Sequence, residues 1–250
     1  MQFQNGNLVL DRHRDLIFLP ALAGDLVTEM KEIRQSTGFD WDQIIDGANE
    51  KDKFPQASLN QNTTIYVWAH GNRSKSAIAV GKVQMSPRAV LRGLAAAGMT
   101  PAYDGNVFFW SCFAGVFDGF AESFAMHCKT QGFVHLTVHA TPFVTGEVKS
   151  SHFFVQDLAS LKAQLVATAD SSKDVETQAL RARDEAIKEM RGNMQQDGDW
   201  AWRNTRLVNY ALMGGFKRVR VQDIVSFDPA TIVVRSAEAP GRMAREGNQG

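Results

Sequence analysis

Two short apolar runs in the middle of the chain each end in residues that could do chemistry. Residues 65–69 lead into His70-Gly71, and residues 107–110 lead into Ser111-Cys112. A cysteine thiolate is a nucleophile, and a histidine can carry the protons of the reaction. Parallel strands joined by a right-handed helical crossover end at the same edge of a sheet. We therefore expect His70 and Cys112 to lie side by side although they are 42 positions apart.

The expected surroundings of Cys112 favour a reactive thiol. A helix is predicted to begin directly after it, and the positive end of a helix dipole lowers the pKa of a nearby thiol. Gly71 leaves the backbone beside the histidine unobstructed, so its N–H could face a substrate carbonyl.

A crossover helix is predicted between the two strands. Ser86 can cap it, Pro87 suits its first position and Gly98 suits its end. Residues 77–83 alternate enough for a small strand before this helix. The apolar face of the helix is formed by Val90, Leu91, Leu94 and Ala95.

A second helix and a third parallel strand are predicted after Cys112. Phenylalanines recur at helical spacing, at Phe113, Phe117, Phe120 and Phe124. Residues 133–138 then alternate as a strand. His139 and Thr141 follow that strand and should emerge at the same edge as Cys112, so both are candidate substrate-binding residues.

The N-terminal part is predicted to contain two short strands, a helix and a loop. Residues 8–10 and 16–19 form either a hairpin or two successive sheet strands, and residues 24–35 have a helical pattern. Residues 38–62 are polar and broken, which predicts a long surface loop with one helical turn at residues 41–45.

The C-terminal part is predicted to begin with two helices, at residues 153–166 and 172–191. The charged faces of the second are typical of a solvated surface. The polar tail at 237–250 is expected to fray. Short strands are predicted at residues 206–213, 219–225 and 231–234.

Composition argues against several classes of function. Lys plus Arg and Asp plus Glu both number 27, so no overall field favours nucleic acid or an acidic lipid surface. No apolar run has the length of a transmembrane span, and the first residues lack a basic start followed by a long apolar core, so we expect no signal peptide. We expect no nucleic-acid and no membrane partner, and a cytoplasmic protein or an effector secreted without a cleaved signal peptide.

Neither a disulfide nor a metal or other cofactor is expected. Cys128 continues the apolar face of the helix predicted after Cys112 and should be buried, roughly 24 Å from Cys112 along that helix. A free Cys112 suits a reducing compartment. The spacing of the candidate ligands matches no recognised metal site; they are His127, Cys128, His135 and His139.

These motifs resemble those of the caspase-like (clan CD) cysteine peptidases. The shared features are a hydrophobic strand ending in His-Gly, a capped crossover helix and a second strand ending in a small residue and cysteine. The clan includes caspases, legumain, clostripain, gingipains, separase and the self-processing protease domains of large bacterial toxins. Bacterial and toxin-type members look nearer than caspases, whose cysteine follows Gln-Ala and whose histidine lies about 50 residues upstream. The resemblance covers roughly residues 60–145.

The resemblance implies a three-layer α-β-α caspase-like (hemoglobinase) fold with a mostly parallel central sheet. A single domain would then span residues 1–236, with an N-terminal extension at 1–60 and a helical addition at 153–192.

The resemblance also implies a cysteine endopeptidase with a protein or peptide substrate, either self-processing or a bacterial effector. Cys112 would be the nucleophile, His70 the general acid/base, and the N–H groups of Gly71 and Cys112 the oxyanion hole. Two alternatives stay open: a catalytically inactive interaction module of the same fold, and a thiol acyltransferase or amidase that uses the same dyad.

Overall fold

The computed structural model describes residues 1–21, 24–37, 43–71, 77–80, 83–116, 118–143, 145–146, 148, 151–157 and 216–233. The α-helices of these residues are α1 (Gly24–Thr37), α2 (Pro87–Ala96) and α3 (Phe120–Thr130), and two 3-10 turns are η2 (Gln56–Ser58) and η3 (Val221–Asp223). The central sheet contains β3 (Leu16–Leu19), β4 (Ile44–Asp46), β5 (Thr64–Trp68), β9 (Asn106–Trp110), β10 (Thr137–Ala140) and β13 (Val225–Phe227). Smaller sheets consist of β1 (Gln2–Gln4) with β2 (Asn7–Val9), of β6 (His70–Gly71), β7 (Ile78–Val80) and β8 (Val83–Met85), and of β11 (Phe154–Gln156) with β12 (Phe216–Arg218).

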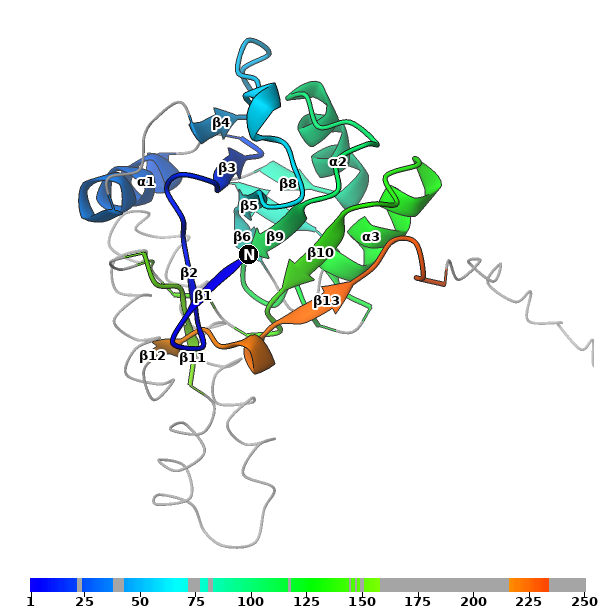
Figure 1. Cartoon of the computed structure of the whole chain (residues 1–250). Coiled ribbons are helices and arrows are strands. Elements are labelled where there is room, and N and C mark those ends of the chain that lie inside the picture. The colour runs from blue at the N-terminus through cyan, green and yellow to red at the C-terminus, as the bar shows by residue number, and fades with distance from the viewer. Residues whose placement is uncertain are drawn as a thin grey trace, which may run out of the picture.

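The central sheet has the strand order β13-β10-β9-β5-β3-β4. The five strands β10, β9, β5, β3 and β4 run parallel to one another. The edge strand β13 pairs with β10 in the antiparallel direction. Helices α2 and α3 cover one face of the sheet, and α1 lies on the other side (Figure 1). The protein is therefore an α/β protein with a mixed, mostly parallel sheet, which confirms the predicted fold class at this level.

Strand alternation decides which side chains fill each face of the sheet. On one face, Phe153 packs against the aromatic side chains of β5 and β9, with ring centroids 4.8 Å from Tyr66 and 4.6 Å from Trp110. On the other face, Phe109 of β9 meets Phe120 and Phe124 of α3 edge to face. The strand that leads to Cys112 is thus packed on both faces.

The crossover helix forms as the sequence predicts. The Ser86 hydroxyl accepts a hydrogen bond from the amide of Ala89 at 3.3 Å, and Pro87 begins α2. Gly98 follows the helix in a left-handed conformation with φ of +109°. The small strand expected at residues 77–83 is present as β7, which pairs with β8 in a hairpin.

Residues 1–60 are not an extension of the fold, which corrects the sequence-based prediction. They supply β3 and β4, and Ile17 of β3 pairs with Ile44 on one side and Tyr66 on the other. The stretch at 38–62, expected to be a surface loop, contains β4, whose residues Ile44 and Ile45 are buried. A three-residue strand is too short to show an alternating pattern, so only its pairing with β3 identifies it.

The prediction of a helix at 153–166 is wrong for its described residues, because Phe154–Gln156 form β11. This strand pairs with β12 in the antiparallel direction. The strand predicted at 231–234 is a turn in its described part, since the carbonyl of Asp228 accepts hydrogen bonds from the amides of Thr231 and Ile232.

Two other predicted strands are displaced. The third parallel strand, expected to begin at residue 133 and to continue through residues 139–142, begins later and runs from Thr137 to Ala140. The stretch at 219–225 contains the turn η3 and the first residue of β13. The other C-terminal predictions lie outside the described residues, namely residues 158–192, 206–213 and 237–250.

Candidate active site

His70 and Cys112 follow neighbouring strands at the carboxyl edge of the central sheet. β5 and β9 pair with Trp68 opposite Trp110. The N–H of Ala69 then donates to the carbonyl of Trp110 at 3.4 Å, so the pairing continues beyond the named strands. His70 and Cys112 each lie two positions after these tryptophans and are partly exposed. The chain path thus brings both residues to one edge, within reach of solvent.

Gly71 packs directly against the backbone of Cys112. A Cβ added at position 71 would lie 1.9 Å from the carbonyl oxygen of Cys112 and 2.8 Å from its amide nitrogen. Only a residue without a side chain fits at this distance. Gly71 belongs to β6, which pairs with β7, so this small sheet holds the His70-Gly71 pair against Cys112.

The chain makes a tight turn immediately after Cys112. Phe113 has φ of +60°, which is uncommon for a bulky side chain and costs conformational energy. Its N–H donates to the carbonyl of Phe143 at 2.9 Å, and this bond holds the turn against the segment after β10. Backbone strain of this kind often occurs at functional sites.

This turn corrects the prediction of a helix directly after Cys112. Helix α3 begins at Phe120, eight positions later, with Gly119 at its N-cap. The field of a helix falls off within its first turn, so α3 does not supply the thiolate stabilisation expected at Cys112. Phe113 is not part of the helix, and Phe117 lies outside the described residues.

Thr141 is near the Cys112 turn but is closed to solvent. Its carbonyl accepts a hydrogen bond from the amide of Gly115 at 3.0 Å, and its hydroxyl accepts one from the amide of Phe143 at 3.0 Å. The residue is 0% exposed. Thr141 therefore braces the turn, and this placement does not support a role in substrate binding.

His139 points away from Cys112. Its Nε2 lies 2.8 Å from Oδ1 of Asn106, at the start of β9, and its Nδ1 lies 2.8 Å from the hydroxyl of Ser226 on β13. The ring is buried, and loss of solvation lowers the pKa of His139 to about 4. The structure does not bring this expected substrate-binding residue to the site.

Thr145 is a neighbour of Cys112 that the sequence analysis missed. Its hydroxyl oxygen lies 3.5 Å from the Cys112 sulfur, a hydrogen-bonding distance for this pair. Thr145 also forms an isolated antiparallel bridge with Val155 of β11. No local pattern marks this threonine, since the contact arises only where two distant segments meet.

The two cysteines differ in environment. Cys128 is 0% exposed in α3, and burial raises the pKa of its thiol. Cys112, in contrast, is partly exposed. Cys112 is therefore the more accessible thiol.

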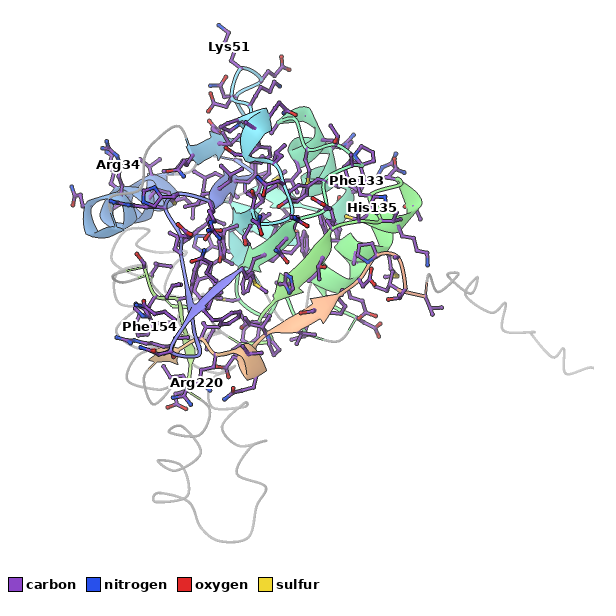
Figure 2. The ribbon with its side chains drawn as sticks, viewed as in Figure 1. Arg34, Lys51, Phe133, His135, Phe154 and Arg220 are labelled. Carbon is purple, nitrogen blue, oxygen red and sulfur yellow. The ribbon has the colours of Figure 1, made fainter. Side chains whose placement is uncertain are left out.

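The candidate metal ligands do not converge. His135 lies in the exposed loop before β10 (Figure 2), whereas His139 is a buried residue of β10 itself. Among the described residues, no group of three His, Cys, Asp or Glu side chains could hold a metal ion.

An open cavity with basic walls lies near the β11–β12 pair, and Lys217 on its wall forms a 2.8 Å ion pair with Asp223. None of its lining residues belongs to the edge that carries His70 and Cys112. The cavity is lined by Asn7, Asp157, Lys217, Arg218 and Arg220.

The chain matches no protein-family model, and no curated protein matches it either. None of the helices in the described part is both long and apolar enough to span a bilayer.

Proposed function

We propose that this protein is a cysteine endopeptidase of three-layer caspase-like fold, in which Cys112 and His70 form the catalytic dyad. The observation that carries the proposal is the meeting of Cys112 with His70-Gly71 at the ends of two adjacent parallel strands. Helices on both sides of a mostly parallel sheet are compatible with that fold. The partial exposure of Cys112 and the strained residue after it support a reactive role.

In the proposed reaction, the Cys112 thiolate attacks the carbonyl carbon of the scissile peptide bond. The N–H groups of Gly71 and Cys112, two residues whose backbones pack against each other, hold the resulting oxyanion. His70 gives the departing amine the proton that it took from the Cys112 thiol, leaving a thioester on Cys112. His70 then takes a proton from water as the water attacks the thioester carbonyl, and it passes this proton to the departing sulfur, which releases the acid product and restores the thiol.

The test is a peptide-library cleavage assay with the purified protein and its Cys112→Ala variant. We expect cleavage by the unaltered protein and none by the variant. The matched control is Cys128→Ala, which removes the buried thiol of α3 and should retain cleavage if the protein folds. Persistent cleavage by Cys112→Ala would overturn the proposal, because the nucleophile would then be another group.

Alkylation by iodoacetamide separates a peptidase from an inactive module. Cys112 should react faster than Cys128 through exposure alone, so the informative comparison is with His70→Ala. If His70 activates the thiol, this variant should label Cys112 more slowly at pH 7. Equal rates would favour the inactive module.

A further inference from the structure

The contact between Cys112 and Thr145 joins residues 33 positions apart. The sulfur and the hydroxyl oxygen are 3.5 Å apart, and in the neutral state either atom could donate the hydrogen. The contact lies at the end of β9 where the proposed nucleophile leaves the sheet. The threonine hydroxyl therefore lies beside the reacting atom of the proposed nucleophile.

Ionisation of the thiol removes this ambiguity. A thiolate has no hydrogen to donate, whereas the threonine hydroxyl can still donate its own. A hydrogen bond made to the charged form of a group favours that form. The threonine thus offers Cys112 a source of stabilisation that α3, which begins at Phe120, does not provide.

The rest of the fold holds Thr145 in place. Besides the bridge to Val155, the N–H of Gly146 donates to the carbonyl of Phe154 at 2.7 Å. Val155 is fully buried, and Phe153 just before β11 packs on Trp110, two residues before Cys112. Both partners of the contact are therefore fixed to the same aromatic core, which keeps the hydroxyl beside the sulfur.

We propose that Thr145 is a positioning residue whose hydroxyl donates a hydrogen bond to the Cys112 thiolate. This inference rests on the proposed role of Cys112 as nucleophile and adds a residue that the dyad itself does not include. Thr145 acts through Cys112, holding the sulfur and favouring its charged form before substrate binds.

The experiment compares Thr145→Val and Thr145→Ser with the unaltered protein. Valine keeps the branched shape that suits the bridge to Val155 but has no hydroxyl, whereas serine keeps the hydroxyl. Thr100→Val, at an exposed threonine beyond α2, is the matched control. The rate of iodoacetamide labelling of Cys112 is measured by mass spectrometry over about five pH units, from about pH 5 to about pH 10, a range that includes the ordinary pKa of a cysteine thiol. The values of kcat and KM are measured for a cleaved peptide.

We expect Thr145→Val to move the labelling midpoint to higher pH and to slow labelling at pH 7 about tenfold, the effect of losing one hydrogen bond to a charged group. kcat should fall by a similar factor with little change in KM, while Thr145→Ser and Thr100→Val stay near the unaltered protein. An unchanged midpoint in a folded Thr145→Val variant would overturn the inference. So would faster labelling, since Thr145 would then only cover the sulfur.

Failure of this inference can be told apart from failure of the proposed function. If Cys112→Ala abolishes cleavage but Thr145→Val leaves the labelling profile unchanged, the proposed peptidase activity is supported and the proposed role of Thr145 is refuted. If Cys112→Ala still cleaves, the proposed Cys112 peptidase is refuted. The labelling profile of Thr145→Val still shows whether Thr145 stabilises the Cys112 thiolate.

Discussion

Replacing Gly71 with alanine tests the contact on which the proposed site depends. The added Cβ would lie 1.9 Å from the carbonyl oxygen of Cys112, whereas ordinary contact begins near 3.4 Å. The His70-Gly71 pair and the Cys112 turn would have to separate by about 1.5 Å, the difference between these two distances. The crowding atoms are backbone atoms, so a side-chain rotation cannot relieve the clash.

This displacement has two expected consequences. Overpacking of this kind costs roughly 1–3 kcal/mol in the free energy of unfolding. A misplacement of about 1 Å can also reduce a reaction rate about 100-fold, so kcat/KM should fall at least that far although Cys112 and His70 are both present. Urea unfolding and peptide cleavage measure the two effects separately.

Gly132→Ala is a suitable control for the loss of stability. Gly132 has φ of +82° and no atom within 4 Å of an added Cβ, so alanine there strains the backbone without crowding the site. We expect it to lower stability by roughly 1–2 kcal/mol while kcat/KM stays unchanged. A folded Gly71→Ala variant with unaltered stability and unaltered kcat/KM would refute the argument that glycine is required beside Cys112.

Two predictions concern buried titratable groups away from the site. Burial raises the pKa of Asp15 to about 7, so the native state holds a proton that the unfolded chain releases near pH 4, and stability falls as pH rises between these values. Asp15→Asn should remove this decline, on the order of 1–4 kcal/mol, in urea unfolding from pH 4 to 8; an unchanged slope would contradict the assignment. The lowered pKa of His139 gives stability the opposite pH dependence. As pH drops below the ordinary pKa of 6.5, the unfolded chain takes up a proton before the native state does, so stability falls. His139→Gln should weaken this acid sensitivity and lower the free energy of unfolding by roughly 1–3 kcal/mol at pH 7, with kcat per folded molecule unchanged. A selective rise in KM would instead support the expected role of His139 in substrate binding.

Much of the central βαβ unit could be predicted from the sequence. The strands β5 and β9 are continuous apolar runs, and α2 carries its own start and stop residues in Ser86, Pro87 and Gly98. Parallel pairing of the two strands then brings His70 and Cys112 to the same edge whatever the rest of the chain does. The burial of Cys128 was also predicted, because Cys128 lies four residues after Phe124 on the apolar face of the same helix, and α3 includes both residues.

Other parts of the site depended on contacts between distant segments. The phenylalanine spacing after Cys112 suited a helix, but hydrogen bonds from Phe113 and Gly115 to the segment after β10 hold a turn there and delay α3. His139 was expected at the Cys112 edge, yet Asn106 and Ser226 satisfy both ring nitrogens at the opposite end of β9 and on β13.

The sequence by itself determined the elements whose stability is local: apolar strands, a capped helix and the order in which they place a histidine and a cysteine. Only the tertiary structure decided that β4 completes the sheet, that Gly71 has no room for a side chain and that Thr145 lies beside the thiol. The physical reason is that helix caps and apolar periodicity act over a few residues, whereas a close approach or a hydrogen bond between distant segments depends on how the whole core packs.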